Sequence, residues 1–87
     1  LPLEGQAEAA TRAGSQSFYF ASRFFPAPLR RRAYAIYWFC RTTDDLVDEA
    51  PTIEKGRTEL DAWESELRHG LGGGRVEHPV LRHFLAV

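Results

Sequence analysis

The stretch Arg30-Arg-Arg-Ala-Tyr-Ala-Ile-Tyr-Trp-Phe-Cys-Arg-Thr-Thr-Asp-Asp-Leu-Val-Asp-Glu49 decides the fold, because no helix breaker interrupts it. Pro28 precedes it, in a place suited to the first turn of a helix, and Pro51 follows and ends the helix. At about 100° per residue, four reactive side chains of this helix share an arc of roughly 60°: Tyr37, Arg41, Asp44 and Asp48. Carboxylates at positions i and i+4 lie one above the other, about 6 Å apart along the axis. That spacing suits the binding of a cation.

The remaining segments also predict helices. Ser15 or Ser17 offers an N-cap, Pro26 and Pro28 stop the second helix, and Gly70 to Gly74 form a flexible linker. No segment alternates apolar and polar residues with period two, so no strand is expected. The sequence therefore predicts an all-α fold with helices near 3–14, 17–25, 28–50, 52–70 and 79–87.

Length and termini suggest a part of a larger domain. The chain has 87 residues, 44% of them hydrophobic, which allows one small domain of marginal stability. It begins at Leu1 rather than Met and ends at Val87, just after an apolar run, so both ends look cut. We therefore expect loose packing or self-association through apolar faces that lack partner helices. The residues expected on these faces are Leu60, Trp63, Leu67, Val80, Phe84 and Leu85.

Charge and cysteine content narrow the classes of partner and compartment. With 11 basic and 12 acidic residues the net charge is −1, so a nucleic-acid partner is not expected. The single cysteine, Cys40, lies amid Ile36, Phe39 and Val47, which predicts a buried packing role and fits a reducing compartment. No apolar run reaches membrane-spanning length, and the N-terminal residues lack the charged-then-apolar pattern of a leader. We expect a cytoplasmic chain whose contact with membranes, if any, is peripheral.

The long helix carries a second polar sector, which consists of Arg31, Thr42, Asp45 and Glu49. Two polar sectors separated by apolar ones suggest that one faces water and that the other, with Asp44 and Asp48, faces an internal cavity. The alternative is that Asp44, Asp48 and their neighbours form a solvated charged run. Spacing alone favours this alternative, since charged helix faces are commoner than metal sites.

Chemistry gives the arc a specific use. Mg²⁺ prefers oxygen ligands, keeps several waters and is usually held by one or two carboxylates together with substrate phosphates. Asp44 and Asp48 fit that need, and Arg41 could form charge-assisted bonds to phosphate oxygens. The aromatic faces of Phe18, Tyr37 and Phe39 could stabilise a carbocation, although ordinary core packing is the commoner role of an aromatic ring.

Three motifs together resemble the squalene and phytoene synthases, which condense two prenyl diphosphates head to head. They are Ser15-Gln-Ser-Phe18, the run from Arg30 to Arg41, and Asp44-Asp-Leu-Val-Asp48, with looser agreement at Leu60-Asp-Ala-Trp-Glu64 and His78-Pro-Val-Leu81. The resemblance spans nearly all of this chain but only the N-terminal portion of the family's domain. It implies an all-α isoprenoid-synthase bundle with a central cavity, to which this chain contributes the first of two aspartate-rich motifs.

The resemblance also implies roles for individual residues. Asp44 and Asp48 would bind Mg²⁺, Arg41 and Ser17 would contact diphosphate, and Phe18 and Tyr37 would line the prenyl pocket. The implied reaction joins two farnesyl or geranylgeranyl diphosphates through a cyclopropyl intermediate to a C30 or C40 product, and only members that reduce the product need NADPH.

The chain departs from the family's pattern at two positions. Gln16 stands where members commonly have Lys or Arg, and Gly14 stands where some have His. These departures motivate an alternative of another class: a non-catalytic relative that serves as an assembly or lipid-binding module.

Overall fold

The computed structural model describes residues 2–87 and contains five helices: α1 (Pro2–Gly14), α2 (Gln16–Ser22), α3 (Ala27–Asp48), α4 (Ile53–Leu71) and α5 (Pro79–Ala86). No strand occurs within this described range, which confirms the all-α class. The interpretation of Leu1 as a cut end concerns a residue outside the described range.

The residues at the helix starts explain most boundaries. The Ser15 hydroxyl accepts a hydrogen bond from the Phe18 amide at 3.2 Å and so caps α2. Thr52 caps α4 in the same way through the amide of Lys55, at 3.1 Å. Proline occupies the first turn of both α3 and α5, where its missing N–H costs nothing. These boundaries fall within two residues of the predicted ones.

The end of α2 differs from the prediction, which extended the helix to Phe25. The helix ends at Ser22, and the amides of Arg23, Phe24 and Phe25 each bond to the carbonyl three residues earlier. Such i→i+3 bonds make a tighter turn than an α-helix. Arg30 secures this turn, since its guanidinium donates to the Phe25 carbonyl at 3.1 Å.

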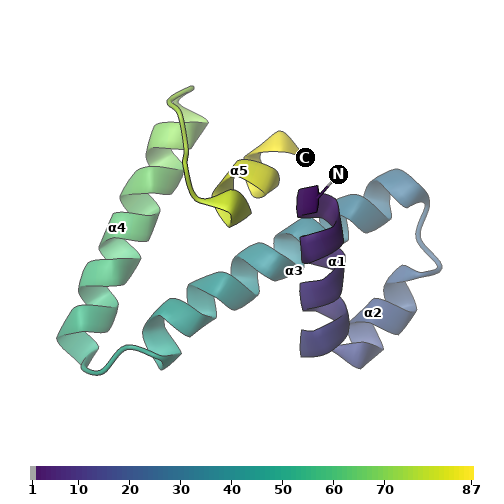
Figure 1. The fold of residues 1–87 in the computed structure, drawn as a ribbon, viewed down its shortest axis with the longest axis horizontal. Coiled ribbons are helices and arrows are strands. Elements are labelled where there is room, and N and C mark those ends of the chain that lie inside the picture. Colours follow the sequence, from purple (N-terminus) through teal and green to yellow (C-terminus); the bar gives the residue numbers. More distant parts are fainter. Residues whose placement is uncertain (1) are drawn as a thin grey trace.

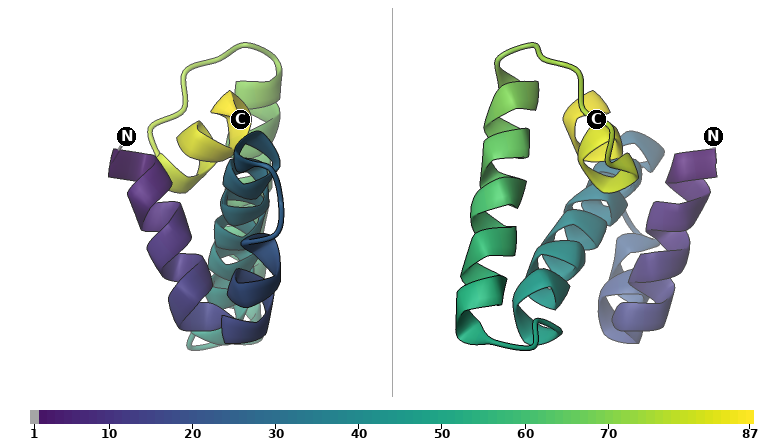
Figure 2. Two further views of the ribbon diagram at one scale, coloured as in Figure 1. Left: turned by 90° about the vertical axis from the view of Figure 1, so that its right-hand side faces the viewer. Right: turned by 60° about the vertical axis from the view of Figure 1, so that its left-hand side comes forward.

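The helices are arranged around α3, the longest of them (Figure 1). At the N-terminal end of α3, α1 packs across it, and α2 lies against α1. After the turn at residues 49–52 the chain reverses into α4, which diverges from α3, and α5 fills the angle between the two (Figure 2). A positive φ of 93° at Gly73 allows the reversal after α4.

One apolar core joins α3, α4 and α5. Its buried members are Trp63, Val76, Val80 and Leu81, against which Trp38, Phe39, Leu46, Leu67 and Leu85 pack. The Trp63 indole donates to the Thr43 hydroxyl at 2.9 Å. The expectation that Trp63 and Val80 lack partners is therefore wrong, because α5 folds back onto α4. Leu60 stays partly exposed on α4, at 36%.

A second, more polar contact layer joins α1, α2 and α3. The Tyr19 hydroxyl donates to the Glu8 carboxylate at 2.8 Å, and the Tyr19 ring stacks on Tyr34 with centroids 5.8 Å apart. The buried hydroxyl of Ser22 lies 3.1 Å from that of Tyr34. These contacts fix α2 against both neighbouring helices.

The predicted burial of Cys40 is wrong. The thiol is exposed, and its neighbours Ile36 and Val47 are 52% and 48% exposed. The reason is that, within residues 2–87, the helices packing on α3 approach it from other sides. The apolar flank that suggested a packing role is real, but none of the described helices covers it.

Candidate functional site

The carboxylates of the candidate site lie on the surface of α3. Asp44 and Asp48 are one turn apart at the C-terminal end of the helix, and both are exposed, as is Arg41. The prediction that they face an internal cavity is not met within the described residues. Their exposure agrees with the alternative of a solvated face, and it leaves both carboxylates open to a ligand.

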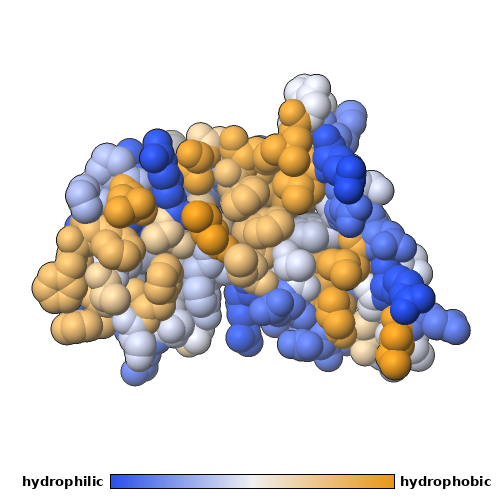
Figure 3. Space-filling model, turned by 180° about the vertical axis from the view of Figure 1, so that it is seen from behind, coloured by the Kyte–Doolittle hydropathy of each residue, from blue (hydrophilic) through white to orange (hydrophobic). Residues whose placement is uncertain are grey.

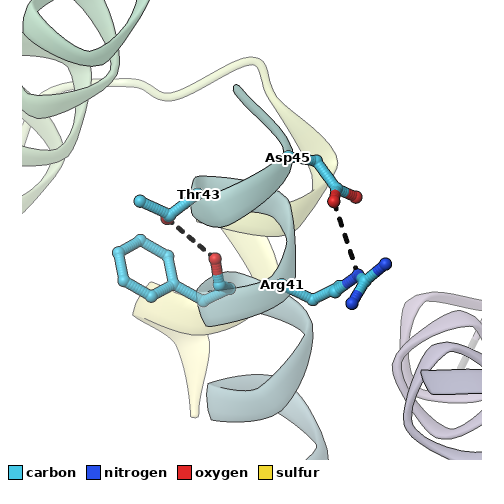
Figure 4. Close-up of polar contacts among 4 residues, drawn as sticks. Arg41, Thr43 and Asp45 are labelled. Atoms are coloured by element: carbon cyan, nitrogen blue, oxygen red, sulfur yellow. Dashed lines mark hydrogen bonds and ion pairs between the residues drawn. The ribbon is translucent and has the colours of Figure 1, made fainter. Parts of the chain in front are cut away.

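Arg41 has a different partner from the one that the arc suggested. Its Nε lies 3.4 Å from a carboxylate oxygen of Asp45, and the two side chains are 57% and 38% exposed. Figure 4 shows Arg41 and Asp45 on one side of α3, whereas Thr43 points to the other. The sequence analysis placed Asp45 in a different polar sector of the helix from Arg41. The contact between the two side chains shows that this division is wrong at Asp45. The cause is that residues i and i+4 are neighbours on a helix surface.

Two predicted site residues, Phe18 and Tyr37, meet between two helices. The rings of Phe18 on α2 and Tyr37 on α3 are stacked, with centroids 5.9 Å apart and planes inclined by 21°. Both residues are half-buried. Ser17, next to Phe18, is exposed on α2. The structure therefore brings Phe18 and Tyr37 together one turn before Arg41, and Asp44 follows on the same helix.

The position of Tyr37 depends on Gly14, which the sequence analysis noted only as a departure from the family's pattern. A Cβ atom at Gly14 would collide with the Tyr37 hydroxyl and would lie 2.9 Å from the ring carbon Cζ. Gly14 thus lets α1 end directly against Tyr37. Sequence reasoning missed this role, and it also missed the Glu8–Tyr19 bond, because residues so far apart in sequence give no local signal of their contact.

The Glu8–Tyr19 bond changes the acidity of the tyrosine. The hydrogen bond to the Glu8 carboxylate, together with partial desolvation and the negative charge of Glu8, raises the pKa of Tyr19 above its ordinary value of 10.0. Arg12, whose guanidinium carbon lies 5.9 Å from the centre of the Tyr19 ring, opposes this shift. Tyr19 is therefore a neutral hydrogen-bond donor at physiological pH, which suits a residue that anchors α2.

The two exposed carboxylates of α3 are suited to a Mg²⁺ ion that is also coordinated by the phosphates of a substrate. Neither Asp44 nor Asp48 forms an ion pair with another described residue, whereas Asp45 is paired with Arg41. No group of three or more potential ligands occurs in this part of the chain. Two carboxylates leave most of an octahedral shell to water and phosphate, which is the usual arrangement for Mg²⁺ at phosphate sites.

A partly open pocket lies away from these carboxylates. This cavity of about 260 Å³ between α1, α3 and α5 is lined by Glu4, Glu8, Arg30, Tyr34 and His83, among others. His83 is only 5% exposed, and its Nε2 has no hydrogen-bond partner among residues 2–87. None of the predicted site residues lines this cavity, so it is separate from the candidate site.

Comparison with known proteins identifies the family. The family model described as squalene/phytoene synthase matches residues 11–87. This chain belongs to the squalene/phytoene synthase family. The match includes every residue of the candidate site, from Ser17 and Phe18 to Asp48.

Individual relatives in the family carry phytoene synthase names. A bifunctional lycopene cyclase/phytoene synthase of Phaeosphaeria nodorum is 47% identical over 66% of this chain and 9% of its own length. A bifunctional enzyme of the same name from Neurospora crassa is 42% identical over 79% of this chain and 11% of its own length. The phytoene synthase of Cereibacter sphaeroides is 49% identical over 59% of this chain and 14% of its own length.

The matched region is a small part of each relative. The chain spans about a tenth of the length of the bifunctional relatives that it resembles. No solved structure matches the chain. No helix among residues 2–87 is long and apolar enough to cross a membrane.

Proposed function

We propose that the protein carrying this chain is a Mg²⁺-dependent prenyltransferase that condenses two farnesyl or geranylgeranyl diphosphates head to head. The product is a C30 or C40 isoprenoid, formed through a cyclopropyl intermediate. Membership of the squalene/phytoene synthase family supports the reaction class, and the relatives' names favour the phytoene synthase branch. In this proposal the chain is the N-terminal part of a longer domain.

The proposal rests on the exposure of Asp44 and Asp48. Neither carboxylate forms an ion pair with another described residue. When bound there, Mg²⁺ would neutralise charge on the diphosphate leaving group. Asp44 and Asp48 would hold the ion from one helical face. Asp61 on α4 is also an exposed carboxylate, but it lies away from Asp44 and Asp48. It therefore serves as a control for substitutions at the proposed metal site.

Arg41 supplies a cation for the diphosphate oxygens. To reach them it must leave Asp45, and an exposed ion pair of this kind is worth about 0–1 kcal/mol. The change of partner therefore costs little compared with a charge-assisted bond to phosphate. Asp45 would keep the guanidinium near Asp44 until the substrate binds. Ser17 would add a hydroxyl donor from α2.

Phe18 and Tyr37 would hold the first prenyl chain. The diphosphate departs with the electron pair of its carbon–oxygen bond and leaves an allylic cation. The stacked rings present electron-rich faces, which attract such a cation. The double bond of the second substrate then attacks the cation, and loss of a proton closes the cyclopropane ring. Gly14 contributes by allowing Tyr37 to occupy its place.

Product analysis tests this function. The protein expressed from its complete gene is incubated with farnesyl or geranylgeranyl diphosphate and Mg²⁺, with and without NADPH, and hydrocarbons are identified by mass spectrometry. The expected result is a C30 or C40 hydrocarbon that disappears when EDTA removes the metal. Binding of the substrates without diphosphate release would instead support the non-catalytic lipid-binding alternative.

A further inference from the structure

The short helix α2 carries two of the proposed site residues, Ser17 and Phe18, yet it has little stability of its own. It spans seven residues, and isolated helices shorter than about 12–15 residues are marginal in water. Its outward side contributes little packing among the described residues, since Phe20 is 61% exposed. Figure 3 shows orange side chains on the surface of this end of the molecule, at the left of the view. The place of Ser17 and Phe18 therefore depends on the contacts of the inner face of α2.

Tyr19 is the half-buried side chain at which the inner contacts of α2 converge. Its hydroxyl donates to the Glu8 carboxylate on α1 at 2.8 Å, and its ring stacks on Tyr34 of α3. The guanidinium carbon of Arg12, also on α1, lies 5.9 Å from the centre of the Tyr19 ring. Tyr19 therefore contacts both neighbouring helices, and its hydrogen bond is directed to α1.

Ser22 supplies a second contact on the same face of α2. Its buried hydroxyl donates to the Tyr19 carbonyl at 2.7 Å and lies 3.1 Å from the Tyr34 hydroxyl. At about 100° per residue, Tyr19 and Ser22 are about 60° apart around the helix, whereas Ser17 lies about 140–160° from both. Two contacts on one face fix the rotation of α2 about its axis. This rotation sets the direction in which Ser17 points.

We propose that Glu8 is a positioning residue for the candidate site. Through Tyr19 it holds α2 in the rotation that presents Ser17 to the substrate and stacks Phe18 on Tyr37. The inference deepens the proposed function and rests on it for the roles of Ser17 and Phe18. Glu8 itself touches no substrate. A hydrogen bond to a carboxylate suits this role, because it is stronger than one between neutral groups.

A small displacement of α2 matters because the proposed contacts have a short reach. A hydroxyl that donates to a phosphate oxygen lies about 2.5–3.0 Å from it. A misplacement of about 1 Å costs about a hundredfold in rate when it moves a reacting group. Loss of the Glu8 carboxylate leaves the stacking on Tyr34 and the Ser22 contact in place, so α2 keeps its helix but gains freedom to turn. We therefore expect a loss in kcat/KM of about tenfold, smaller than that upper figure.

Hydrogen–deuterium exchange tests the contact without substrate or Mg²⁺. The protein is expressed from its complete gene, and exchange of the amides in residues 15–22 is followed by mass spectrometry. Glu8→Ala should speed this exchange about threefold to tenfold, as expected for the loss of one hydrogen bond. Glu8→Gln should restore protection, because its amide oxygen still accepts from the Tyr19 hydroxyl. Tyr19→Phe should match Glu8→Ala, and the double variant should add nothing to either.

Turnover kinetics separate a positioning role from a general loss of stability. Both Glu8→Ala and Ser17→Ala should lower kcat/KM for the prenyl diphosphate. Independent effects multiply, whereas a Glu8 that acts through α2 gives a double variant with a smaller loss than the product of the two. Glu8→Gln should keep most of the wild-type kcat/KM. Glu59→Ala removes an exposed carboxylate from α4 and should change neither kcat/KM nor exchange in residues 15–22.

Three outcomes would overturn the proposal. They are unchanged exchange of residues 15–22 in Glu8→Ala, losses in Glu8→Ala and Ser17→Ala that multiply, and a Glu8→Gln variant as impaired as Glu8→Ala. The last result would assign the effect to the charge of Glu8 rather than to its bond with Tyr19. A wild-type protein without turnover would overturn the proposed function instead, and the exchange measurement would still decide whether Glu8 holds α2.

Discussion

The hydroxyl of Tyr37 occupies the space in which a side chain at Gly14 would begin. Gly14 ends α1, and Tyr37 lies near the middle of α3, so this contact sets how closely α1 approaches the candidate site. The Tyr37 ring also stacks on Phe18, so a shift of the ring away from Gly14 would disturb this pair. Gly14 is thus a packing requirement of the pair.

Replacement of Gly14 by alanine should destabilise the protein. In an open helical position Gly→Ala stabilises by roughly 0.5–1 kcal/mol. At Gly14 the new methyl group must displace the Tyr37 ring, and overpacking of this kind costs about 1–3 kcal/mol. We expect a net loss in the free energy of unfolding, measured by urea denaturation.

Gly5→Ala is the matched control for this substitution. Gly5 lies in the same helix, and no described residue outside the local helix backbone comes within 4 Å of the place where its Cβ would lie. Gly5→Ala should therefore raise the free energy of unfolding. If both substitutions stabilise the protein to the same extent, the close approach of Tyr37 to Gly14 is not real.

Thr43→Val should weaken the junction between α3 and α4. The Thr43 hydroxyl accepts from the Trp63 indole at 2.9 Å and donates to the Phe39 carbonyl at 2.8 Å. Valine keeps the shape but leaves the buried indole N–H without its partner, which costs about 1–3 kcal/mol. Urea unfolding followed by tryptophan fluorescence measures the loss.

Thr58→Val provides the comparison for Thr43→Val. The Thr58 hydroxyl makes the same kind of bond to a carbonyl one turn earlier, that of Glu54 at 3.0 Å, but it is exposed and accepts nothing from Trp63. Its loss should change stability by less than about 0.5 kcal/mol. Equal effects of the two substitutions would show that the indole bond contributes nothing.

Stability should decline at alkaline pH in part through Tyr19. The Glu8 hydrogen bond raises the pKa of Tyr19 in the folded state above the ordinary 10.0 of the unfolded chain. The folded state then binds the proton more tightly, so its advantage is complete below pH 10 and is lost as pH rises through the folded pKa. Tyr19→Phe should flatten the pH dependence of the unfolding midpoint above pH 10. An unchanged slope would exclude Tyr19 as the group responsible.

Helix number, order and most boundaries follow from local chemistry. Ser15, Thr52 and the prolines at 28 and 79 act within a few residues of their own position, so a sequence pattern is enough to place them. Phe18 and Tyr37, which the family resemblance singled out, stack on each other, and their role in lining a prenyl pocket stays a prediction. In each case the decisive residues lie on one helix or in a known motif.

Properties that depend on neighbouring helices could not be predicted in this way. Cys40 and Ile36 form an apolar flank, yet burial depends on whether a helix packs there, and none of the described ones does. Helical spacing placed Arg41 in line with Asp44, but it could not decide between Asp44, Asp45 and a phosphate as its partner. The end of α2 depended on the turn that Arg30 secures from the next helix.

Mg²⁺-dependent release of diphosphate by wild type, Asp44→Asn and Asp48→Asn is the most direct test of the proposed metal site. Each protein is expressed from its complete gene, and Asp61→Asn serves as an exposed carboxylate control on α4. We predict that Asp44→Asn and Asp48→Asn lower turnover at least about a hundredfold, since several kcal/mol of charge stabilisation is lost. Their unfolding curves should match wild type, because both side chains are exposed. Wild-type turnover in either variant would contradict a metal site at Asp44 and Asp48.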